Sequence, residues 1–255
     1  MNTYETIRVE QDGGIAVVTM DRPRVRNAID LAMVREMTAA LEDLSHRDGV
    51  RVMILRGEGG KAFAGGADIA QLRERRALDA FTQVNARLFQ LIEDFPHPTI
   101  AAIEGWALGG GCEIALACDL RVAGETARLG FPEVGLGIFP AAGGTHRLPR
   151  LVGVGKAKEL VFTGRILDAA TALDIGLVEH VVPEGGALEK AREIAAEIAR
   201  NGDLAVRVAK MALNAIARGS HPEPIEKLGQ ALLFESPDKF ERMTAFLEKR
   251  KAKES

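Results

Sequence analysis

The pattern of apolar and polar positions divides the first half of the chain into alternating strand-like and helix-like segments. Five short apolar runs, rich in β-branched residues, predict strands. These runs are residues 6–9, 15–20, 52–55, 99–103 and 120–123. The turn sequence QDGG between the first two runs predicts a β-hairpin. Alternation of strands with helices is typical of an α/β fold.

Apolar residues at helical spacing predict the helices between these strands. The first covers residues 30–44, with Asp30 as its N-cap. The second is predicted as one long amphipathic helix over residues 72–95, ended by the prolines of FPHP. A third begins near Cys112, after three consecutive glycines. Residues 57–69 are predicted to form a glycine-rich loop.

The chain becomes mostly helical after residue 143. The segments with helical spacing are residues 156–162, 169–173, 187–200, 204–217, 223–234 and 239–249. A composition shift near residue 195 predicts an α/β core over residues 1–195, with the active site, and a C-terminal helical region over residues 196–255.

Composition and charge exclude several classes of protein. The 255 residues are enough for one large core, and the net charge of -3 favours neither nucleic acid nor an anionic membrane. The most apolar stretch, residues 99–118, is interrupted by Glu104, Glu113 and glycines, so no membrane-spanning helix is expected. The N-terminus lacks a signal-like segment, and the two cysteines cannot form a disulfide framework. We therefore expect a cytoplasmic protein.

The loop at residues 57–69 is the first candidate site. Gly65 and Gly66 allow another group to approach the backbone, and an N–H near Ala67 could stabilise an anion or oxyanion. Taken alone, a flexible surface loop is the better interpretation. A phosphate-binding P-loop is excluded because Ala62 stands where that motif needs Ser or Thr.

The second and third candidates each contain a glutamate. The turn at Gly109 and the two glycines after it leads into a helix, with Glu113 in the first helical turn. Such a glutamate can also simply complement the helix dipole. Pro132 fixes the backbone before Glu133, which by itself could be a surface residue. Two carboxylates in one site can act as general base and general acid in the addition or removal of water.

Other catalytic chemistries lack their motifs. The five histidines show no metal-ligand spacing, so no metal site is predicted. None of the serines stands in a G-x-S-x-G motif. Cys112 has no nearby histidine in sequence and is predicted to be a small buried residue.

Three motifs together strongly resemble the enoyl-CoA hydratase (crotonase) family. They are KAFAGGADI, GWALGGGCEIALACDLRVA and FPEVGLGIFPAAGGTHRLPRLVG. The resemblance extends to RPRVRNAI, LVFTGRILDAATALDIGLVEHVV and TAFLEKRK, and so covers nearly the whole chain. It implies a superhelix of stacked ββα turns, with C-terminal helices that complete a trimer and a hexamer built from two trimers.

The resemblance also implies roles for the candidate residues. The amides of Ala67 and Gly110 would form the oxyanion hole for a thioester carbonyl. Glu113 and Glu133 would hold a water molecule, with Glu113 as the base toward water and Glu133 delivering the proton to C2. The remaining substrate contacts would come from Arg26, Ala64, Gly65, Gly66, Asp68, Ile69 and Gly109 and, on a neighbouring subunit, from Phe246 and Lys249. Coenzyme A would be part of the substrate, so no separate cofactor is expected.

The expected activity is hydration of trans-2-enoyl-CoA to 3-hydroxyacyl-CoA. Isomerases related to this family usually keep one carboxylate, so retention of both glutamates favours hydration. Enoyl-CoA isomerisation and hydration of a branched, methylglutaconyl-type thioester remain alternatives, and a non-catalytic RNA-binding relative is a more distant one. The chain departs from the family at Ala141 and His146, where Gly and Gln are common. Acyl chain length and pathway, including β-oxidation of fatty acids, stay open.

Overall fold

The computed structural model describes residues 4–254, and the chain divides into two compact units after Ala196. The first unit is built around a six-stranded sheet. In spatial order its strands are β1 (Ile7–Asp12), β2 (Ile15–Met20), β3 (Val52–Gly57), β5 (Thr99–Ile103), β7 (Leu120–Gly124) and β10 (His180–Val182). The β1–β2 pair is the antiparallel hairpin predicted from QDGG, and all other pairs are parallel.

A second, four-stranded sheet accompanies the first. Its strands are β4 (Ala62–Ala64), β6 (Trp106–Leu108), β8 (Arg128–Gly130) and β9 (Ile166–Asp168), with only β9 antiparallel to its neighbour. These strands were missed in the sequence because three residues are too few to show an alternation. Consecutive chain segments therefore add one strand to each sheet before a helix follows, which confirms the predicted stacked ββα turns.

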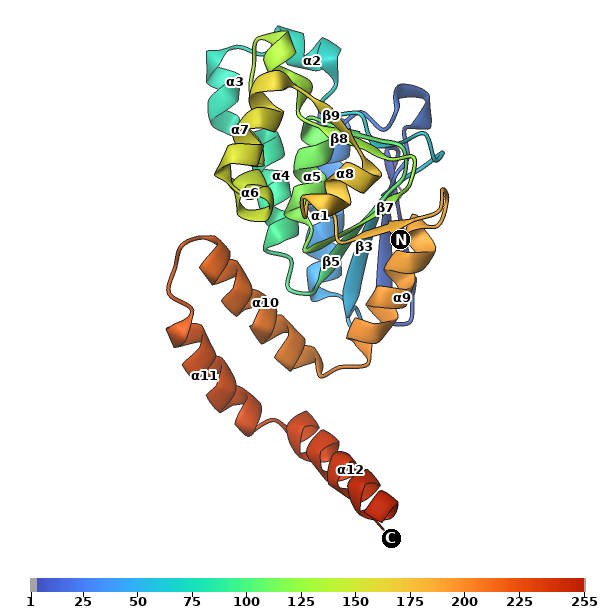
Figure 1. Ribbon diagram of the computed structural model, residues 1–255, viewed down its shortest axis with the longest axis vertical. Helices are drawn as coiled ribbons and strands as arrows, with labels where there is room; N and C mark the ends of the chain where they lie inside the picture. The colour runs from blue at the N-terminus through green and yellow to red at the C-terminus, as the bar shows by residue number, and fades with distance from the viewer. Residues whose placement is uncertain (1–3, 255) are drawn as a thin grey trace. The chain divides into compact units, whose positions relative to one another are not determined.

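Helices pack beside the two sheets in the first unit (Figure 1). Their bounds are η1 (Pro23–Val25), α1 (Leu31–His46), α2 (Ile69–Glu74), α3 (Ala77–Thr82), α4 (Val84–Glu93), α5 (Gly110–Ala117), η2 (Pro132–Leu136), α6 (Gly144–Val152), α7 (Val154–Thr163), α8 (Ala169–Asp174) and α9 (Ala187–Ala199), the last of which crosses the unit boundary. Asp30 caps α1 as predicted, since its side chain accepts a hydrogen bond from the Met33 amide at 2.8 Å.

The single helix predicted over residues 72–95 is wrong, because three helices occupy this region. The backbone is extended at Arg75 and Arg76, where Asp79 accepts a hydrogen bond from the Arg76 amide and starts α3. A left-handed residue, Gln83 at φ 48°, then separates α3 from α4. Leu78 is 80% exposed, so the helical spacing of apolar residues here does not reflect burial.

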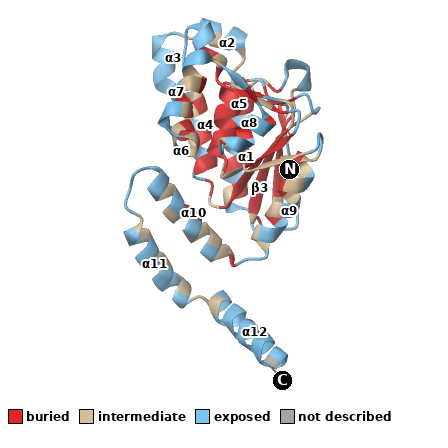
Figure 2. Ribbon diagram, viewed as in Figure 1, coloured by how far each residue is buried: buried red, intermediate tan, exposed pale blue. Residues whose placement is uncertain are grey.

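The buried core lies in the first unit, along the strands of the large sheet and in α4 and α5 (Figure 2). Its largest fully buried side chains include Phe63, Phe89 and Phe131. Burial of one such side chain contributes roughly 1.5–3 kcal/mol to folding. Phe63 lies in β4, next to the loop that carries Ala67, and Phe131 immediately precedes η2, which carries Glu133. Both site segments are therefore anchored in the core.

The second unit consists of helices α10 (Asp203–Ala217), α11 (Glu223–Phe234) and α12 (Pro237–Glu254). Many of its large apolar side chains are exposed, among them Leu213, Leu228 and Phe246. No helix in the described part of the chain is long and apolar enough to cross a membrane.

Candidate active site

Two backbone amides, those of Ala67 and Gly110, lie next to each other in the first unit. A Cβ added at Gly110 would lie 3.5 Å from the Ala67 nitrogen. Within residues 4–254, neither amide donates a hydrogen bond to another group of the chain. Gly110 is the first residue of α5, where amides have no partner within the helix. The pair is therefore available to a ligand oxygen.

The close approach of β4 and α5 depends on glycines. A Cβ at Gly111 would lie 1.9 Å from the carbonyl oxygen of Ala64. Gly66 has a φ of +104°, and a Cβ there would lie 2.9 Å from the carbonyl oxygen of Leu108. Any side chain at these positions would separate the two segments. The sequence predicted that these glycines let another group approach the backbone closely. In the structure that group is another backbone segment of the same chain.

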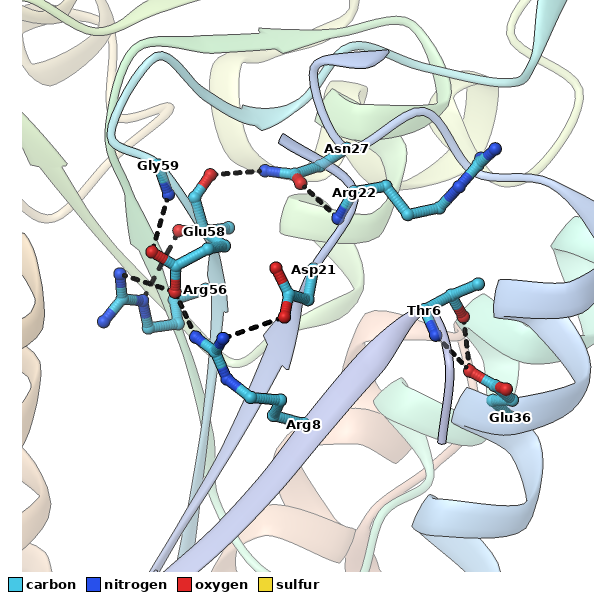
Figure 3. Close-up of polar contacts among 10 residues, drawn as sticks. Thr6, Arg8, Asp21, Arg22, Asn27, Glu36, Arg56, Glu58 and Gly59 are labelled. Carbon is cyan, nitrogen blue, oxygen red and sulfur yellow. Dashed lines mark hydrogen bonds and ion pairs between the residues drawn. The ribbon is translucent and has the colours of Figure 1, made fainter. Parts of the chain in front are cut away.

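A buried asparagine fixes the turn that supports the Ala67 loop (Figure 3). Asn27 Oδ1 accepts a hydrogen bond from the Arg22 amide, and its Nδ2 donates to the carbonyl oxygens of Glu58 at 3.0 Å and Ala62 at 2.7 Å. The Gly65 amide in turn donates to the Arg26 carbonyl at 2.8 Å. Asn27 was not identified from the sequence, although the left-handed turn it occupies, at φ 54°, favours this residue type.

Ile29 orients the Ala67 amide. Its own amide donates to the Gly66 carbonyl at 2.8 Å, and its carbonyl accepts from the Asp68 amide at 3.1 Å. The bridge between Ile29 and Ala67 is parallel and uses the groups on either side of Ala67. The Ala67 N–H is therefore left unpaired by the geometry of a parallel pair.

Glu113 is held by two amides in the first turn of α5. It is 4% exposed, and its Oε1 accepts hydrogen bonds from Ala142 at 2.8 Å and Gly144 at 2.9 Å. Burial raises its pKa to about 7, and the charge of Glu133 adds to this rise. The two amides and Arg147 oppose the rise by stabilising the charged form. Glu113 therefore titrates near neutral pH.

Glu133 lies in the short helix η2 and is 8% exposed. Both of its carboxyl oxygens are buried and have no hydrogen-bond partner within the described chain. Burial raises the pKa of Glu133, and its own backbone amide only partly opposes this effect. A Cβ added at Gly109 would lie 2.9 Å from Glu133 Oε1, so Glu133 lies against the turn that carries Gly110.

The structure thus brings together two free amides and two buried carboxyl groups. Glu133 lies against Gly109, and the next residue, Gly110, has a free amide. Glu113 lies in the first turn of α5, three residues after Gly110. Two amide donors can bind a carbonyl oxygen that gains negative charge. Two carboxyl groups of raised pKa can take a proton from water and give one to carbon.

The other predicted contact residues are spread over both units. Asp68 caps α2 through a hydrogen bond from the Gln71 amide, and Ile69, which follows it, is 57% exposed. Phe246 and Lys249 are exposed residues of α12 in the second unit. Arg26 lines a hollow together with Pro23, Arg24, Asn27, Glu58, Gly59, Lys61 and Ala62. This hollow contains three cationic side chains beside the Ala64–Gly65 backbone.

The described cysteines and metal-ligating residues offer no further chemistry. Cys112 and Cys118 are buried and form no disulfide. Burial raises the pKa of the Cys112 thiol well above its usual range, which agrees with its prediction as a small buried residue. No cluster of three or more His, Cys, Asp or Glu residues between positions 4 and 254 could hold a metal ion.

The amides that hold Glu113 were missed in the sequence. Gly144 begins α6, and its amide donates a hydrogen bond to Glu113. A Cβ at Gly144 would lie 3.1 Å from Glu113 Oε1, and this close contact accounts for the glycine. At the two departures from the family pattern, Ala141 and His146 are both exposed.

Comparisons with known proteins agree with this geometry. The family model for enoyl-CoA hydratase/isomerase matches residues 10–254. A crotonyl-CoA hydratase of Syntrophomonas wolfei is 43% identical over 98% of this chain and 97% of its own. A short-chain-enoyl-CoA hydratase of Clostridium acetobutylicum is 42% identical over 95% of each chain. The crystal structure of enoyl-CoA hydratase from Bacillus anthracis matches with a TM-score of 0.91 and 41% identity, covering 96% of this chain and 97% of that one.

The matches extend through both sheets and through the segments that carry Ala67, Gly110, Glu113 and Glu133. The resemblance drawn from the three sequence motifs is confirmed, as is the α/β fold of stacked ββα turns that it implied. This chain is a member of the enoyl-CoA hydratase/isomerase family and has the crotonase fold.

Proposed function

We propose that this chain hydrates trans-2-enoyl-CoA reversibly to 3-hydroxyacyl-CoA. The observation that carries the proposal is the presence of two buried carboxyl groups, Glu113 and Glu133, next to the free amides of Ala67 and Gly110. Addition of water to an enoyl thioester needs a base, an acid and a site for the enolate oxygen. These four groups supply all three.

The amides of Ala67 and Gly110 act on the thioester oxygen. When water adds to C3, the π electrons move toward the carbonyl and the oxygen gains negative charge. Two fixed N–H donors stabilise that charge, an effect worth roughly 3 kcal/mol for each donor in comparable sites. The amides need no reorganisation because glycine contacts and the Ile29 bridge already hold them in place.

Glu113 acts as the base toward water and Glu133 as the proton donor to C2. The O–H bond of water breaks as its oxygen bonds to C3, and Glu113 takes the proton. Glu133 delivers its proton to C2. Transfer of the proton from Glu113 to Glu133 then restores the starting state.

The hydrogen-bond partners support this division of roles. Two amides stabilise the charged form of Glu113, whereas within residues 4–254 no other residue donates a hydrogen bond to the carboxyl oxygens of Glu133. Two interacting carboxyl groups in one site share their protons. A proton on Glu133 also removes the charge that raises the pKa of Glu113. The hydrogen-bond contacts therefore favour Glu113 as the base and leave Glu133 for the role of proton donor.

Coenzyme A enters as part of the substrate, and the mechanism uses no further cofactor. Arg24, Arg26 and Lys61 line one hollow, and their charges suit the phosphates of coenzyme A. The adjoining backbone at Ala64, Gly65 and Gly66, with Asp68 and Ile69 beyond it, is assigned to the pantetheine and adenine, as the sequence motifs implied.

A hydration assay tests the proposal. We expect the purified chain to remove the enoyl absorbance of crotonyl-CoA and to form 3-hydroxybutyryl-CoA. Glu133→Gln should lower the rate by about 10²–10⁴-fold, the usual contribution of a general acid or base. An equally active Glu133→Gln variant, or a wild type without hydratase activity, would overturn the assignment.

The same assay distinguishes the related activities of the family. A 3-enoyl-CoA that is converted faster than the 2-enoyl-CoA would indicate an isomerase. Faster turnover of a methylglutaconyl-type thioester would indicate a branched-chain hydratase. A series of acyl chain lengths then defines the substrate range.

We also infer that the second unit makes contacts between subunits, in a trimer or a hexamer built from two trimers. Its exposed apolar side chains, such as Leu213, Leu228 and Phe234, support this inference because water-exposed clusters of this kind are typical of interfaces. The same unit would then supply Phe246 and Lys249 to coenzyme A on a neighbour. Light scattering of the full chain would show a monomer if the inference is wrong. A cytoplasmic location, supported by the two free cysteines, is part of the same proposal.

A further inference from the structure

A buried ion pair lies behind the loop that holds Glu113. Arg147 of α6 is 4% exposed and Glu93, at the end of α4, is 9% exposed. The Nε and Nη2 atoms of Arg147 both lie 2.6 Å from Glu93 Oε2. Helices α4, α5 and α6 lie side by side, so the pair connects the two helices that flank α5 (Figure 1). A buried ion pair is costly to desolvate and often adds little stability.

The guanidinium of Arg147 also contacts the loop itself. Its Nη1 donates a hydrogen bond to the carbonyl oxygen of Ala142 at 3.2 Å. The amide of the same residue, Ala142, donates to Glu113 Oε1 at 2.8 Å. The Arg147 backbone amide donates to the Gly143 carbonyl at 2.9 Å. Arg147 therefore binds the short segment between the two amides that hold the carboxylate.

Gly143 makes room for this guanidinium. It has a φ of +123°, and a Cβ there would lie 1.8 Å from Arg147 Nη1. The segment between η2 and α6 thus contains one glycine that makes room for Arg147, and the next residue, Gly144, accommodates Glu113 through its amide and its missing side chain. The two features are independent, and both serve the same segment.

We propose that Arg147, held by Glu93, is a positioning residue that fixes the 142–144 loop and through it the catalytic carboxylate of Glu113. The proposal rests on the hydratase function given above. Arg147 does not need to touch the substrate, since it acts through the Ala142 and Gly144 amides. Its positive charge also favours the ionised form of Glu113.

The charged groups around Glu113 define what a pH experiment would report. Glu133 of η2 raises its pKa, and Arg147 of α6 lowers it. Glu93 of α4 is paired with Arg147, His146 of α6 is exposed, and the neighbouring Cys112 thiol is neutral because burial raises its pKa. The strands β4 and β6 beside α5 contribute no titratable side chain.

The test compares Arg147→Lys and Arg147→Met with a matched control, Arg121→Met. Arg121 is also buried and paired with a glutamate, Glu179, and it donates to the carbonyl oxygens of Cys118 at 2.9 Å and Leu177 at 3.0 Å. Within residues 4–254 it makes no hydrogen bond or ion pair with the 142–144 loop. Loss of either arginine should lower thermal stability, whereas only Arg147 should affect the carboxylate.

For Arg147→Met we expect kcat to fall on the order of tenfold to a hundredfold, as for other small misplacements of catalytic groups, with KM within about twofold. The acidic limb of its pH–rate profile should move to higher pH, and Arg147→Lys should restore the limb but only part of kcat. Glu93→Gln, which keeps the arginine, should lower kcat less and serves if Arg147→Met does not fold. The proposal would be overturned if kcat and the acidic limb of the pH–rate profile were unchanged in these variants. It would also be overturned if Arg121→Met showed the same changes.

A measurement without substrate separates this proposal from the proposed function. Carboxyl-carbon NMR of isotope-labelled glutamate follows the titration of Glu113 directly, with Glu113→Gln providing its assignment. Arg147→Met should shift this titration to higher pH and Arg121→Met should not. If the wild type proves inactive as a hydratase while the shift is present, the proposed function fails and the positioning role stands. An unshifted titration in Arg147→Met contradicts the positioning role.

Discussion

Glu113 and Glu133 are both buried glutamates with raised pKa values, yet the regions around them differ sharply in hydrogen-bond donors. The loop before α6 gives two amides to Glu113, and Arg147 supports that loop from behind. No other residue between positions 4 and 254 donates a hydrogen bond to the oxygens of Glu133, which lie against the turn at Gly109.

The difference shows how one site can hold two carboxyl groups in different states. Donors on Glu113 favour its charged form, while burial without donors favours the neutral form of Glu133. The oxygens of Glu133 are left without partners in the chain, so water and substrate can bind to them. An unpaired buried carboxyl group lowers stability, and the proposed role in proton transfer accounts for its presence here where folding does not.

The largest expected effect comes from a methyl group placed against Glu133. Gly109→Ala adds a Cβ 2.9 Å from Glu133 Oε1, at a residue with φ +52°. We expect kcat/KM to fall by about a hundredfold or more, because displacement of a catalytic group by about 1 Å has this effect. Gly135→Ala, also near Glu133 in sequence but with no atom within 4 Å of the new Cβ, is the control and should retain activity. Equal activity of the two variants would refute the contact as a determinant of the site.

An intermediate effect should appear in stability, with different outcomes for the two glutamates. Glu113→Ala leaves the Ala142 and Gly144 amides without an acceptor and should lower the free energy of unfolding by about 1–3 kcal/mol. Glu133→Ala leaves no donor unpaired and should not lower it.

The pH determines the sign of the Glu133 effect. Its pKa in the folded chain is raised above the unfolded value, so its ionisation reduces stability only as the pH rises through the folded pKa. The free energy of unfolding of Glu133→Ala should therefore rise relative to that of the wild type in mildly alkaline buffer, but not in acid. Urea unfolding at two pH values measures both glutamates, and equal losses for the two alanine variants would contradict the difference in their surroundings.

The smallest effect is the dependence of the wild-type rate on pH. Activity requires ionised Glu113, whose pKa is raised to about 7, so kcat/KM should fall up to tenfold per pH unit on the acidic side of that value. A rate that is constant from acid through neutral pH would show that Glu113 is not the titrating base.

The sequence predicted the elements that have a long hydrophobic pattern. The hairpin β1–β2, the cap at Asp30 and helix α11 were predicted within a few residues of their observed bounds, because periodicity and capping act locally. The helix predicted over residues 72–95 failed where Arg76 and Gln83 break it, since apolar spacing there is not matched by burial. The three-residue strands of the second sheet have no pattern of their own and are defined only by pairing.

In the site, too, the sequence predicted residues that belong to a local motif but not the contacts between distant residues. The motifs identified Glu113 and Glu133. Glu133 lies against Gly109, the residue before the Gly110 amide, and Glu113 lies in the first turn of the helix that Gly110 begins. The supporting contacts could not be predicted, because Arg147 and Glu93 are 54 positions apart and Asn27 binds residues 31 and 35 positions away. Residues so far apart in the sequence come into contact only because of the order in which the strands join the sheets.

The backbone contact between Gly111 and Ala64 bears on how chains of this kind can diversify. Since a Cβ at Gly111 would lie 1.9 Å from the Ala64 carbonyl oxygen, the distance between the two activating amides is set without any side chain. Exposed residues such as Ile69 and Phe139 can then vary, by natural selection or in a directed-evolution library, without disturbing the chemical step.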